Sequence, residues 1–261
     1  MKSAPYIETA HDLAKKAGVI MRKNFTSHMK KEWKHDNTPV TETDLAVNAL
    51  VLKEIKEQYS DHSILSEEGS DFSEESEYVW ICDPVDGTHN FSHGIPTATF
   101  ALGLVREGEP ILGVIYDPFL DRLFSAEKGK GAHLNGKPIH VTNNPVLKST
   151  VIGMGKMVKV GNLFPVANAL YGHGVSLITG LSIHYMNALV AAGEFSAAIF
   201  GGTSPHDMAA AKVIIEEAGG KVTDLSGEVP ERYDRDMEGQ LCSNGILHEE
   251  LLKLVKLGFK E

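Results

Sequence analysis

The stretch Asp83-Pro84-Val85-Asp86-Gly87-Thr88 follows directly on the apolar run Tyr78-Val79-Trp80-Ile81-Cys82. A short apolar run of this kind predicts a buried strand, so the two aspartates are expected to emerge together where the strand ends. Pro84 and the Asp-Gly pair favour a sharp fold of the chain, with both carboxylates on the inside or the rim of one bend. Two carboxylates this near to each other repel unless a cation lies between them. The stretch therefore predicts a cation site.

The composition indicates an ordinary globular protein. The chain has 261 residues, 42% of them hydrophobic and 23% charged, which is enough for one large α/β domain or two abutting halves. A formal net charge of -10 argues against a general binder of nucleic acid or membrane surfaces and favours cations and small molecules. No run reaches the ~20 apolar residues of a membrane span, and the N-terminus has no long apolar segment. We expect a cytoplasmic protein in which Cys82 and Cys242 are buried free thiols.

The first half of the chain opens with two predicted helices. Apolar side chains recur at helical spacing over residues 5–26, and a polar, hairpin-like stretch at residues 30–37 follows. Thr41, three residues before Asp44, resembles a capping box that opens a second helix. On this pattern alone, Asp44 is an ordinary acid of a first helical turn, where the helix dipole favours it. The tryptophans are assigned to packing: Trp33 and Trp80.

Strands and turns make up the rest of the first half. A short strand at Ile64-Leu65 runs into Ser66-Glu67-Glu68, and the acidic residues 70–77 are expected to form a surface loop. Three more strand-like runs, separated by turn residues, predict an antiparallel meander: residues 97–105, 111–116 and 123–126.

Strand-like and helix-like segments alternate in the second half. The expected strands are residues 151–152, 175–178, 197–200, 221–223 and 240–243, and the expected helices are residues 163–171, 183–192, 205–218 and 248–259. Ser204-Pro205 is typical of a helix start with Ser as the cap, which places His206 and Asp207 in a first turn that Gly219-Gly220 later ends. We expect an N-terminal α+β half, residues 1–145, a C-terminal α/β half, residues 146–261, and a cleft between them.

Acidic residues at the ends of several elements predict a magnesium site. A hard, oxygen-ligated cation such as Mg²⁺ binds carboxylates, a carbonyl and waters, and substrate phosphate often completes its shell. Glu67, Asp83, Asp86 and Asp207 could supply the carboxylates, whereas the His and Cys spacing of a zinc site is absent. The backbone amides of the turn at Gly87-Thr88 would suit a phosphate. The pattern favours two metals that clamp a phosphoryl group.

Two other interpretations of the acidic stretch fail on spacing. A phosphatase of the haloacid dehalogenase type places its acids as Asp-x-Asp-x-Thr, but here two residues separate Asp83 from Asp86 and one separates Asp86 from Thr88. A calcium loop of the EF-hand type needs a glutamate six residues after the glycine, where this chain has His93. A purely structural Asp-Gly turn stays open on this motif alone.

The segment Asp-Pro-Val-Asp-Gly-Thr-x-Asn, residues 83–90, resembles the first signature of the inositol monophosphatase superfamily of Mg²⁺-dependent, lithium-sensitive phosphatases. Three more segments match in the same order: Val-Thr-Glu-Thr-Asp at residues 40–44, Ser-Glu-Glu at 66–68, and Asp-Met-Ala-Ala to Glu-Ala-Gly-Gly at 207–220. These matches span nearly the whole chain. The resemblance implies a layered α/β/α/β/α sandwich of the sugar-phosphatase type, with an antiparallel meander in the N-terminal half, and a homodimer.

The resemblance also implies two or three Mg²⁺ ions in each site. Glu67, Asp83 and the backbone carbonyl of Val85 would bind one ion. Asp83, Asp86 and Asp207 would bind the second, and Glu67 would also face a weaker third. The four carboxylates and one carbonyl are therefore the expected metal ligands.

The resemblance further implies that the reaction uses an activated water. Thr88, paired with Asp44, would orient and activate this water for in-line attack on phosphorus, so Asp44, Thr88 and Glu67 are the expected catalytic residues. Amides near Gly87 and Thr88 would hold the phosphate, and no covalent intermediate is expected. The family match outweighs the reading of Asp44 as a helix cap. Glu68 is expected to fix the loop or support a ligand.

Departures from the family pattern affect the substrate pocket. Members that act on inositol phosphate often have an acid seven positions before the second-motif aspartate, and this chain has Phe200 there. The usual Trp-Asp becomes His206-Asp207, and the usual Gly-Ser/Thr-Ala becomes Leu181-Ser182-Ile183. We therefore expect a reshaped pocket that includes Ser182, Phe200 and His206. Other histidines are assigned no catalytic role, because loop histidines are more often solvated or locally hydrogen-bonded: His89, His93 and His184.

The expected function is Mg²⁺-dependent hydrolysis of a small phosphomonoester, such as inositol monophosphate or a related sugar phosphate. Fructose 1,6-bisphosphate, NADP, 3'-phosphoadenosine 5'-phosphate and histidinol phosphate are substrates elsewhere in the superfamily and stay open. A different class of function is a non-catalytic partner of the transcription machinery, as some proteins that resemble this family can be. The presence of all the expected acids favours the enzyme. No nucleic acid and no membrane is expected as a partner.

Overall fold

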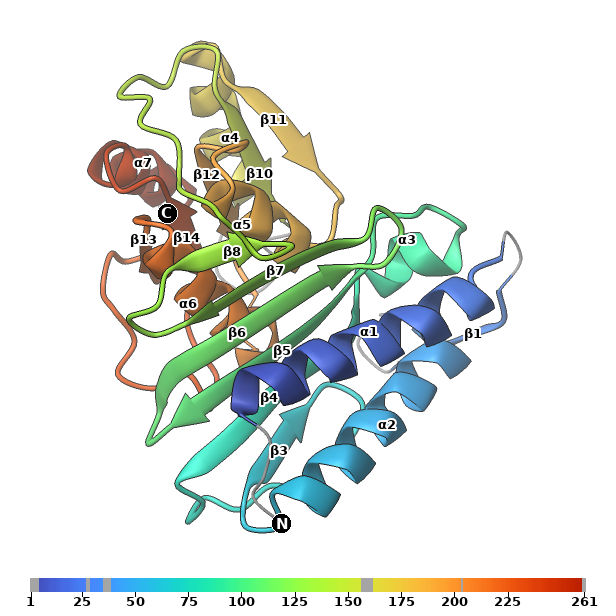
Figure 1. Cartoon of the computed structure of the whole chain (residues 1–261). Coiled ribbons are helices and arrows are strands. Elements are labelled where there is room, and N and C mark those ends of the chain that lie inside the picture. The colour runs from blue at the N-terminus through green and yellow to red at the C-terminus, as the bar shows by residue number, and fades with distance from the viewer. Residues whose placement is uncertain (1–4, 27–28, 35–38, 156–161, 203, 260–261) are drawn as a thin grey trace.

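In the described part of the chain, three pairs of helices alternate with the two larger β-sheets (Figure 1). The computed structural model describes residues 5–26, 29–34, 39–155, 162–202 and 204–259. One pair covers the outer face of a seven-stranded sheet, the second pair lies between the two sheets, and the third covers the outer face of a five-stranded sheet. The expected α/β/α/β/α sandwich is thus confirmed. In this order the pairs are α1 (Tyr6–Asn24) with α2 (Glu42–Gln58), α5 (Ile183–Ala191) with α6 (Ala209–Glu217), and α4 (Leu163–Gly172) with α7 (His248–Val255).

The seven-stranded sheet has the order β3-β4-β5-β6-β7-β8-β9. β3 is parallel to β4, and each later pair of neighbours is antiparallel, as the meander predicts. The strands are β3 (Ser63–Ser66), β4 (Tyr78–Asp86), β5 (Thr99–Arg106), β6 (Glu109–Asp117), β7 (Arg122–Glu127), β8 (Ala132–Leu134) and β9 (Lys137–Pro138).

The five-stranded sheet has the order β11-β10-β12-β14-β13 and is mixed. β10 is parallel to both β11 and β12, whereas β14 is antiparallel to β12 and β13. The strands are β10 (Val151–Met154), β11 (Ser176–Thr179), β12 (Ala197–Phe200), β13 (Lys221–Thr223) and β14 (Gln240–Ser243). Shorter elements complete the fold: β1 (Lys31–Trp33), β2 (Pro39–Thr41), α3 (Thr88–Ser92) and the 3-10 turns η1 (Pro205–Asp207) and η2 (Lys256–Phe259).

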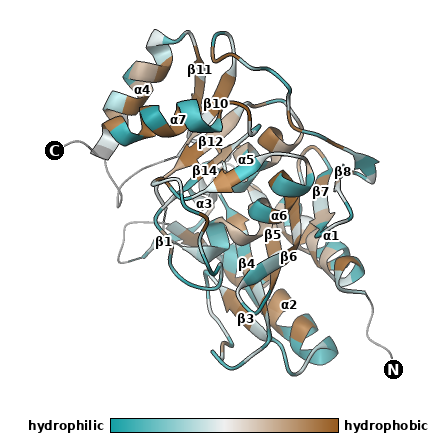
Figure 2. Cartoon of the chain, turned by 90° about the vertical axis from the view of Figure 1, so that its left-hand side faces the viewer, coloured by the Kyte–Doolittle hydropathy of each residue, from teal (hydrophilic) through white to brown (hydrophobic). Residues whose placement is uncertain are grey.

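The alternation of side chains along each strand gives the sheets two buried faces. In β12, Ala197 and Ile199 pack toward α4 and α7, whereas Ala198 packs toward α5 and α6. In Figure 2, β5 and β6 are coloured largely hydrophobic and much of α7 is coloured hydrophilic. Gly113 of β6 lets α6 approach closely, since a Cβ atom there would lie 2.1 Å from the carbonyl oxygen of Ala210. This approach fixes α6, which directly follows η1 and Asp207.

The end of β4 differs from the sequence-based expectation. The strand does not stop at Cys82 but continues to Asp86, with an irregular register against β5 between Asp83 and Asp86. Proline lacks the N–H that a regular ladder needs, and a bulge accommodates it without ending the strand. The bend comes later, at Gly87, whose φ of 87° favours glycine. The prediction of a sharp fold between the two acids was wrong.

Two other expectations need correction. The helix expected at residues 205–218 is divided, because η1 ends at Asp207, Met208 has a non-helical φ of -127°, and α6 starts at Ala209. Ser204 makes no side-chain cap hydrogen bond. Trp33 is 57% exposed on the two-stranded β1-β2 sheet, so its assignment to packing was wrong, whereas Trp80 is fully buried.

Several simpler predictions hold. Cys82 and Cys242 are buried free thiols. β1 and β2 form the antiparallel pair that the hairpin-like stretch suggested, although residues 35–38 of that stretch lie outside the described residues. Within the described ranges, no helix is both long enough and apolar enough to cross a membrane. The division at residues 145 and 146 lies between β9 and β10, and we retain it as a proposal.

Candidate active site

The parallel pair β3 and β4 brings three of the predicted acids to one edge of the sheet. Ser66 pairs with Cys82, and the N–H of Glu67 donates to the Cys82 carbonyl at 3.3 Å. Asp83 follows Cys82 in the strand, and the Val85 N–H donates to Asp83 Oδ1 at 3.1 Å. The carboxyl ends of parallel strands meet at the same edge, so Glu67, Asp83 and Asp86 gather there from separate parts of the sequence.

Asp44 reaches this edge from the first turn of α2. The expected capping box is present: the Thr41 N–H donates to Asp44 Oδ2 at 3.0 Å, and the Thr43 N–H donates to Thr41 Oγ1 at 3.2 Å. The other oxygen, Asp44 Oδ1, accepts a hydrogen bond from Thr88 Oγ1 at 2.9 Å. The cap and the pair with Thr88 therefore coexist, because the carboxylate uses a different oxygen for each.

Asp86 is held by the second half of the chain. Its Oδ2 accepts the N–H of His184 at 2.6 Å and the hydroxyl of Ser182, the N-cap of α5. An anion at a helix N-terminus is stabilised by the unpaired N–H groups and by the helix dipole. His184 also contacts η1, because its Nε2 lies 2.7 Å from the carbonyl oxygen of His206. Asp207 is the next residue in η1.

The acids form a concentrated negative charge. Burial raises the pKa of Asp83 well above its ordinary value, and the charges of Glu67, Asp86, Asp207 and Asp44 raise it further, in that order. Asp83 is 3% exposed and Asp44 is fully buried. Burial also raises the pKa of Asp44, against the opposing effect of hydrogen bonds from Thr41 and Thr88. The other four predicted acids thus lie near enough to Asp83 for their charges to act on it.

One cation from the protein already lies at the edge of this cluster. Lys34 Nζ is 2.8 Å from Glu67 Oε1 and also forms an ion pair with Glu68. Burial works to lower the pKa of the Lys34 ammonium, but the hydrogen bonds to both glutamates raise it above its ordinary value. The sequence analysis did not single out Lys34, because the lysine lies in a polar stretch whose contacts depend on the long-range placement of β1. Glu68 binds Lys34, in keeping with its expected role of fixing the loop.

The donor chemistry of the site fits Mg²⁺. The candidate ligands are all oxygens, and burial together with the neighbouring acids raises the pKa of Asp83. Among the described residues, however, no three His, Cys, Asp or Glu side chains are gathered closely enough to hold an ion as they stand. Hydrogen bonds explain this arrangement, since Lys34 draws Glu67 away and Ser182 and His184 hold Asp86. A metal ion held by these side chains would therefore require them to shift.

The residues expected to contact substrate lie in different surroundings. Gly87 is half-buried at the start of α3, next to Thr88. Ser182 is fully buried, with its hydroxyl bonded to Asp86 and 2.8 Å from Thr99 Oγ1, so it acts on Asp86. Phe200 is 1% exposed and packs in a core cluster with Ile81 and Met208, so its side chain is not open to a substrate in this structure. His206 is partly buried, and burial lowers the pKa of its imidazole.

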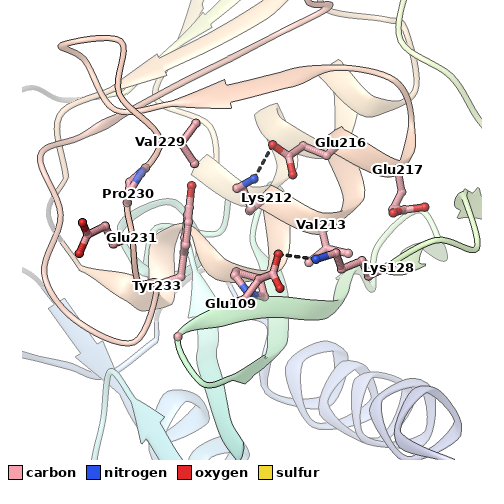
Figure 3. A pocket seen from close by; sticks show the side chains of 12 residues that line it. Glu109, Lys128, Lys212, Val213, Glu216, Glu217, Val229, Pro230, Glu231 and Tyr233 are labelled. Carbon is pink, nitrogen blue, oxygen red and sulfur yellow. Dashed lines mark hydrogen bonds and ion pairs between the residues drawn. The ribbon is translucent and has the colours of Figure 1, made fainter.

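A separate cavity of about 240 Å³ lies between α6, the start of β6 and the loop at residues 229–233 (Figure 3). Figure 3 shows two ion pairs on its walls, Lys212 with Glu216 and Lys128 with Glu109. None of the described residues that line it is one of the predicted site residues. The cavity therefore does not belong to the acid cluster.

Comparisons with known proteins point to one family. The family model described as the inositol monophosphatase family matches residues 2–257. The chain is 34% identical over 216 residues to the fructose-1,6-bisphosphatase/inositol-1-monophosphatase of Thermotoga maritima, over 83% of this chain and 82% of the relative. It is 33% identical over 263 residues to the histidinol-phosphatase of Chlorobaculum parvum, over 98% of this chain and 99% of the relative.

The solved structures lead to the same family. The structure of an inositol monophosphatase from Thermotoga maritima superimposes with a TM-score of 0.88 at 30% identity, over 97% of both chains. This likeness extends through both halves of the fold, as does the family model. The protein therefore belongs to the inositol monophosphatase family, whose members are phosphatases that hydrolyse phosphoric monoesters.

Proposed function

We propose that the protein hydrolyses a small phosphomonoester, inositol monophosphate or a related sugar phosphate, with Mg²⁺ as its cofactor. The observation that carries the proposal is the hydrogen bond between Thr88 Oγ1 and Asp44 Oδ1, at 2.9 Å, beside the acids of β4. A hydroxyl bound to a buried carboxylate is a means of orienting a water and taking up its proton. The pair therefore supports hydrolysis without a covalent intermediate.

Each of the other groups would have a distinct task. Glu67, Asp83, Asp86 and Asp207, with the Val85 carbonyl, would hold two or three Mg²⁺ ions. When bound, the ions would neutralise the carboxylates, bind phosphate oxygens and acidify a water. The N–H groups near Gly87 and Thr88 would hold the phosphate. This oxygen-rich site is also where we propose that Li⁺ inhibits.

The residue at position 200 supports a leaving group that does not need a carboxylate acceptor there. Phe200 occupies the position at which family members that act on inositol phosphate often have an acid, and its side chain is 1% exposed. Without that acid, a polyol loses one hydrogen-bond acceptor, and an anionic group meets less repulsion. Fructose 1,6-bisphosphate, NADP, 3'-phosphoadenosine 5'-phosphate and histidinol phosphate are therefore the alternatives to test. We also propose that the protein is a homodimer.

The test is phosphate release from inositol 1-phosphate and these alternatives in Mg²⁺, for the wild type and for Asp83→Asn. Asn keeps an oxygen for the Val85 N–H but removes the charge, so the rate is expected to fall at least a hundredfold. A full rate in Asp83→Asn would contradict the assignment of the site. Turnover of none of these substrates by the wild type would favour the non-catalytic alternative, a partner of the transcription machinery.

A further inference from the structure

His184 connects two acids that come from distant parts of the fold. Its backbone N–H donates to Asp86 Oδ2 at 2.6 Å, and its ring Nε2 lies 2.7 Å from the carbonyl oxygen of His206. Asp86 ends β4 in the seven-stranded sheet, and Asp207 follows His206 in η1. One residue on α5 therefore touches one acid directly and the peptide that precedes the other.

The contact with His206 fixes the protonation of the ring. A carbonyl oxygen can only accept a hydrogen bond, so Nε2 of His184 must carry the proton. The other ring nitrogen, Nδ1, is buried and has no hydrogen-bond partner among the described residues. A bare Nδ1 is an acceptor, and an unpaired buried acceptor costs less than an unpaired charge. The ring is thus a neutral donor aimed at η1.

η1 is a single short turn, closed by hydrogen bonds from the Asp207 N–H to the Ser204 carbonyl and from the Met208 N–H to the Pro205 carbonyl. Ser204 provides no side-chain cap, and Met208 interrupts the helix directly after Asp207. The hydrogen bonds of a 3-10 turn have poorer geometry than those of an α-helix, so a bond from a neighbouring side chain adds to what holds the turn. The His184 side chain is fully buried, so the hydrogen bond to the His206 carbonyl is shielded from water.

We propose that His184 is a positioning residue that holds η1, and with it Asp207, in register with Asp86 so that the two carboxylates can share one divalent cation. The inference rests on the proposed function, because it assumes that Asp86 and Asp207 bind the same ion. Groups that orient metal ligands without touching the metal typically change metal affinity or activity 10- to 100-fold when they are replaced. Loss of the ring donor would therefore weaken cation binding while the ligands themselves stay in place.

The experiment compares a matched pair of variants at this position. Gln can place a side-chain N–H where His has Nε2–H, whereas Met has a similar length and no donor. Binding of Mn²⁺, used as a paramagnetic probe for Mg²⁺, is measured by electron paramagnetic resonance of the free ion, without any substrate. We expect His184→Met to bind at least about tenfold more weakly than the wild type and His184→Gln to bind within about threefold of it. At saturating Mg²⁺, the kcat of His184→Met should lie closer to the wild-type value than the Mn²⁺ affinity of this variant does.

Equal binding by His184→Met and the wild type would overturn the inference, as would equal losses in the Met and Gln variants, since the donor would then have no role. Asp86→Asn and Asp207→Asn distinguish this failure from failure of the proposed function. If both Asn variants bind Mn²⁺ as the wild type does, the metal assignment itself is wrong. If both lose binding while His184→Met does not, only the positioning role is wrong.

A measurement on the wild type covers the case in which His184→Met does not fold. Nitrogen-15 spectra of the histidine rings should include a neutral ring with a slowly exchanging Nε2 proton that is missing from the spectrum of His184→Gln, whereas the signals of the other buried neutral rings should remain. The signal should persist when Mg²⁺ is added, because the proposed bond belongs to the loaded site. A proton on Nδ1 instead, or a charged ring, would overturn the assignment.

Discussion

The hydroxyl of Thr88 lies 2.9 Å from Asp44 Oδ1 and 2.7 Å from the Val85 carbonyl oxygen. A hydroxyl has a single hydrogen, so these two acceptors compete for it. If a cation takes the Val85 carbonyl, Asp44 is left as the acceptor, and the lone pairs of Thr88 become available to a water. Metal binding would in this way set the direction of the hydrogen bond that catalysis needs.

The first prediction concerns this hydroxyl. Thr88→Val preserves shape but removes the oxygen, so kcat is expected to fall by about 10²- to 10⁴-fold, the range typical of a lost acid-base group. Thr88→Ser keeps a hydroxyl and should retain most of the rate. Mn²⁺ affinity should stay close to that of the wild type in both variants, because no carboxylate is changed. Phosphate-release kinetics provide the measurement, and an unchanged kcat in Thr88→Val would remove Thr88 from the mechanism.

The second prediction concerns how much Asp83 lowers the free energy of unfolding of the metal-free protein. Burial and then the neighbouring acids raise the pKa of Asp83, so the folded state keeps a proton that the unfolded state releases above about pH 4. This residue therefore makes the metal-free protein less stable as the pH rises. Asp83→Asn should raise the free energy of unfolding at pH 8 by about 1–3 kcal/mol and change it little at pH 4.

Urea unfolding in EDTA at the two pH values measures this difference. Asn retains the oxygen that accepts the Val85 N–H, so a lost hydrogen bond does not confuse the comparison. A gain in stability that is the same at both pH values would show that repulsion between the acids is not its cause.

The third prediction is that Mg²⁺ makes the wild type more stable than Asp83→Asn, the reverse of their order in EDTA at pH 8. A ligand at 100 times its Kd stabilises the folded state by about 2.7 kcal/mol, provided that it does not bind the unfolded chain. The wild type should therefore gain several degrees in Tm when EDTA is replaced by saturating Mg²⁺, and Asp83→Asn should gain far less. Calorimetry in the two buffers checks this. An equal gain in both proteins would place the stabilising ion elsewhere.

The sequence predicted the local structure around the candidate site where neighbouring residues decide it. The capping box at Thr41 and Asp44 could be identified from two residues three positions apart, and both of its hydrogen bonds are present. The apolar run before Asp83 predicted the strand, and the family motifs pointed to the remaining acids. These features depend on neighbours in the sequence or on residues that a motif already names.

Tertiary contacts account for what the sequence did not predict. Lys34 reaches Glu67 from 33 positions away, and the His184 N–H reaches Asp86 across 98 positions. No periodicity or spacing encodes such pairs. Pro84 was expected to bend the chain, but a bulge against β5 keeps it within β4. The exposure of Trp33 likewise follows from its place in a two-stranded sheet, which a hydrophobic residue alone does not reveal.

The last prediction concerns His248, which is fully buried at the start of α7. Its Nδ1 lies 2.8 Å from Ser243 Oγ, and its Nε2 lies 3.0 Å from Thr223 Oγ1. Burial, aided by the charge of Lys221, lowers the pKa of His248 from 6.5 to about 4. The unfolded state therefore binds a proton in the window between these values that the folded state does not.

His248 contributes to the free energy of unfolding above about pH 6.5, and this contribution is lost as the pH falls toward 4. Between pH 7 and pH 4.5 the loss should be about 2–3 kcal/mol. The measurement is the difference between the wild type and His248→Gln in EDTA, so that contributions shared by the two proteins cancel. Gln keeps a donor and an acceptor but does not titrate, and its curve should fall less steeply on acidification. Parallel curves would mean that His248 is protonated as readily in the folded protein as in the unfolded chain.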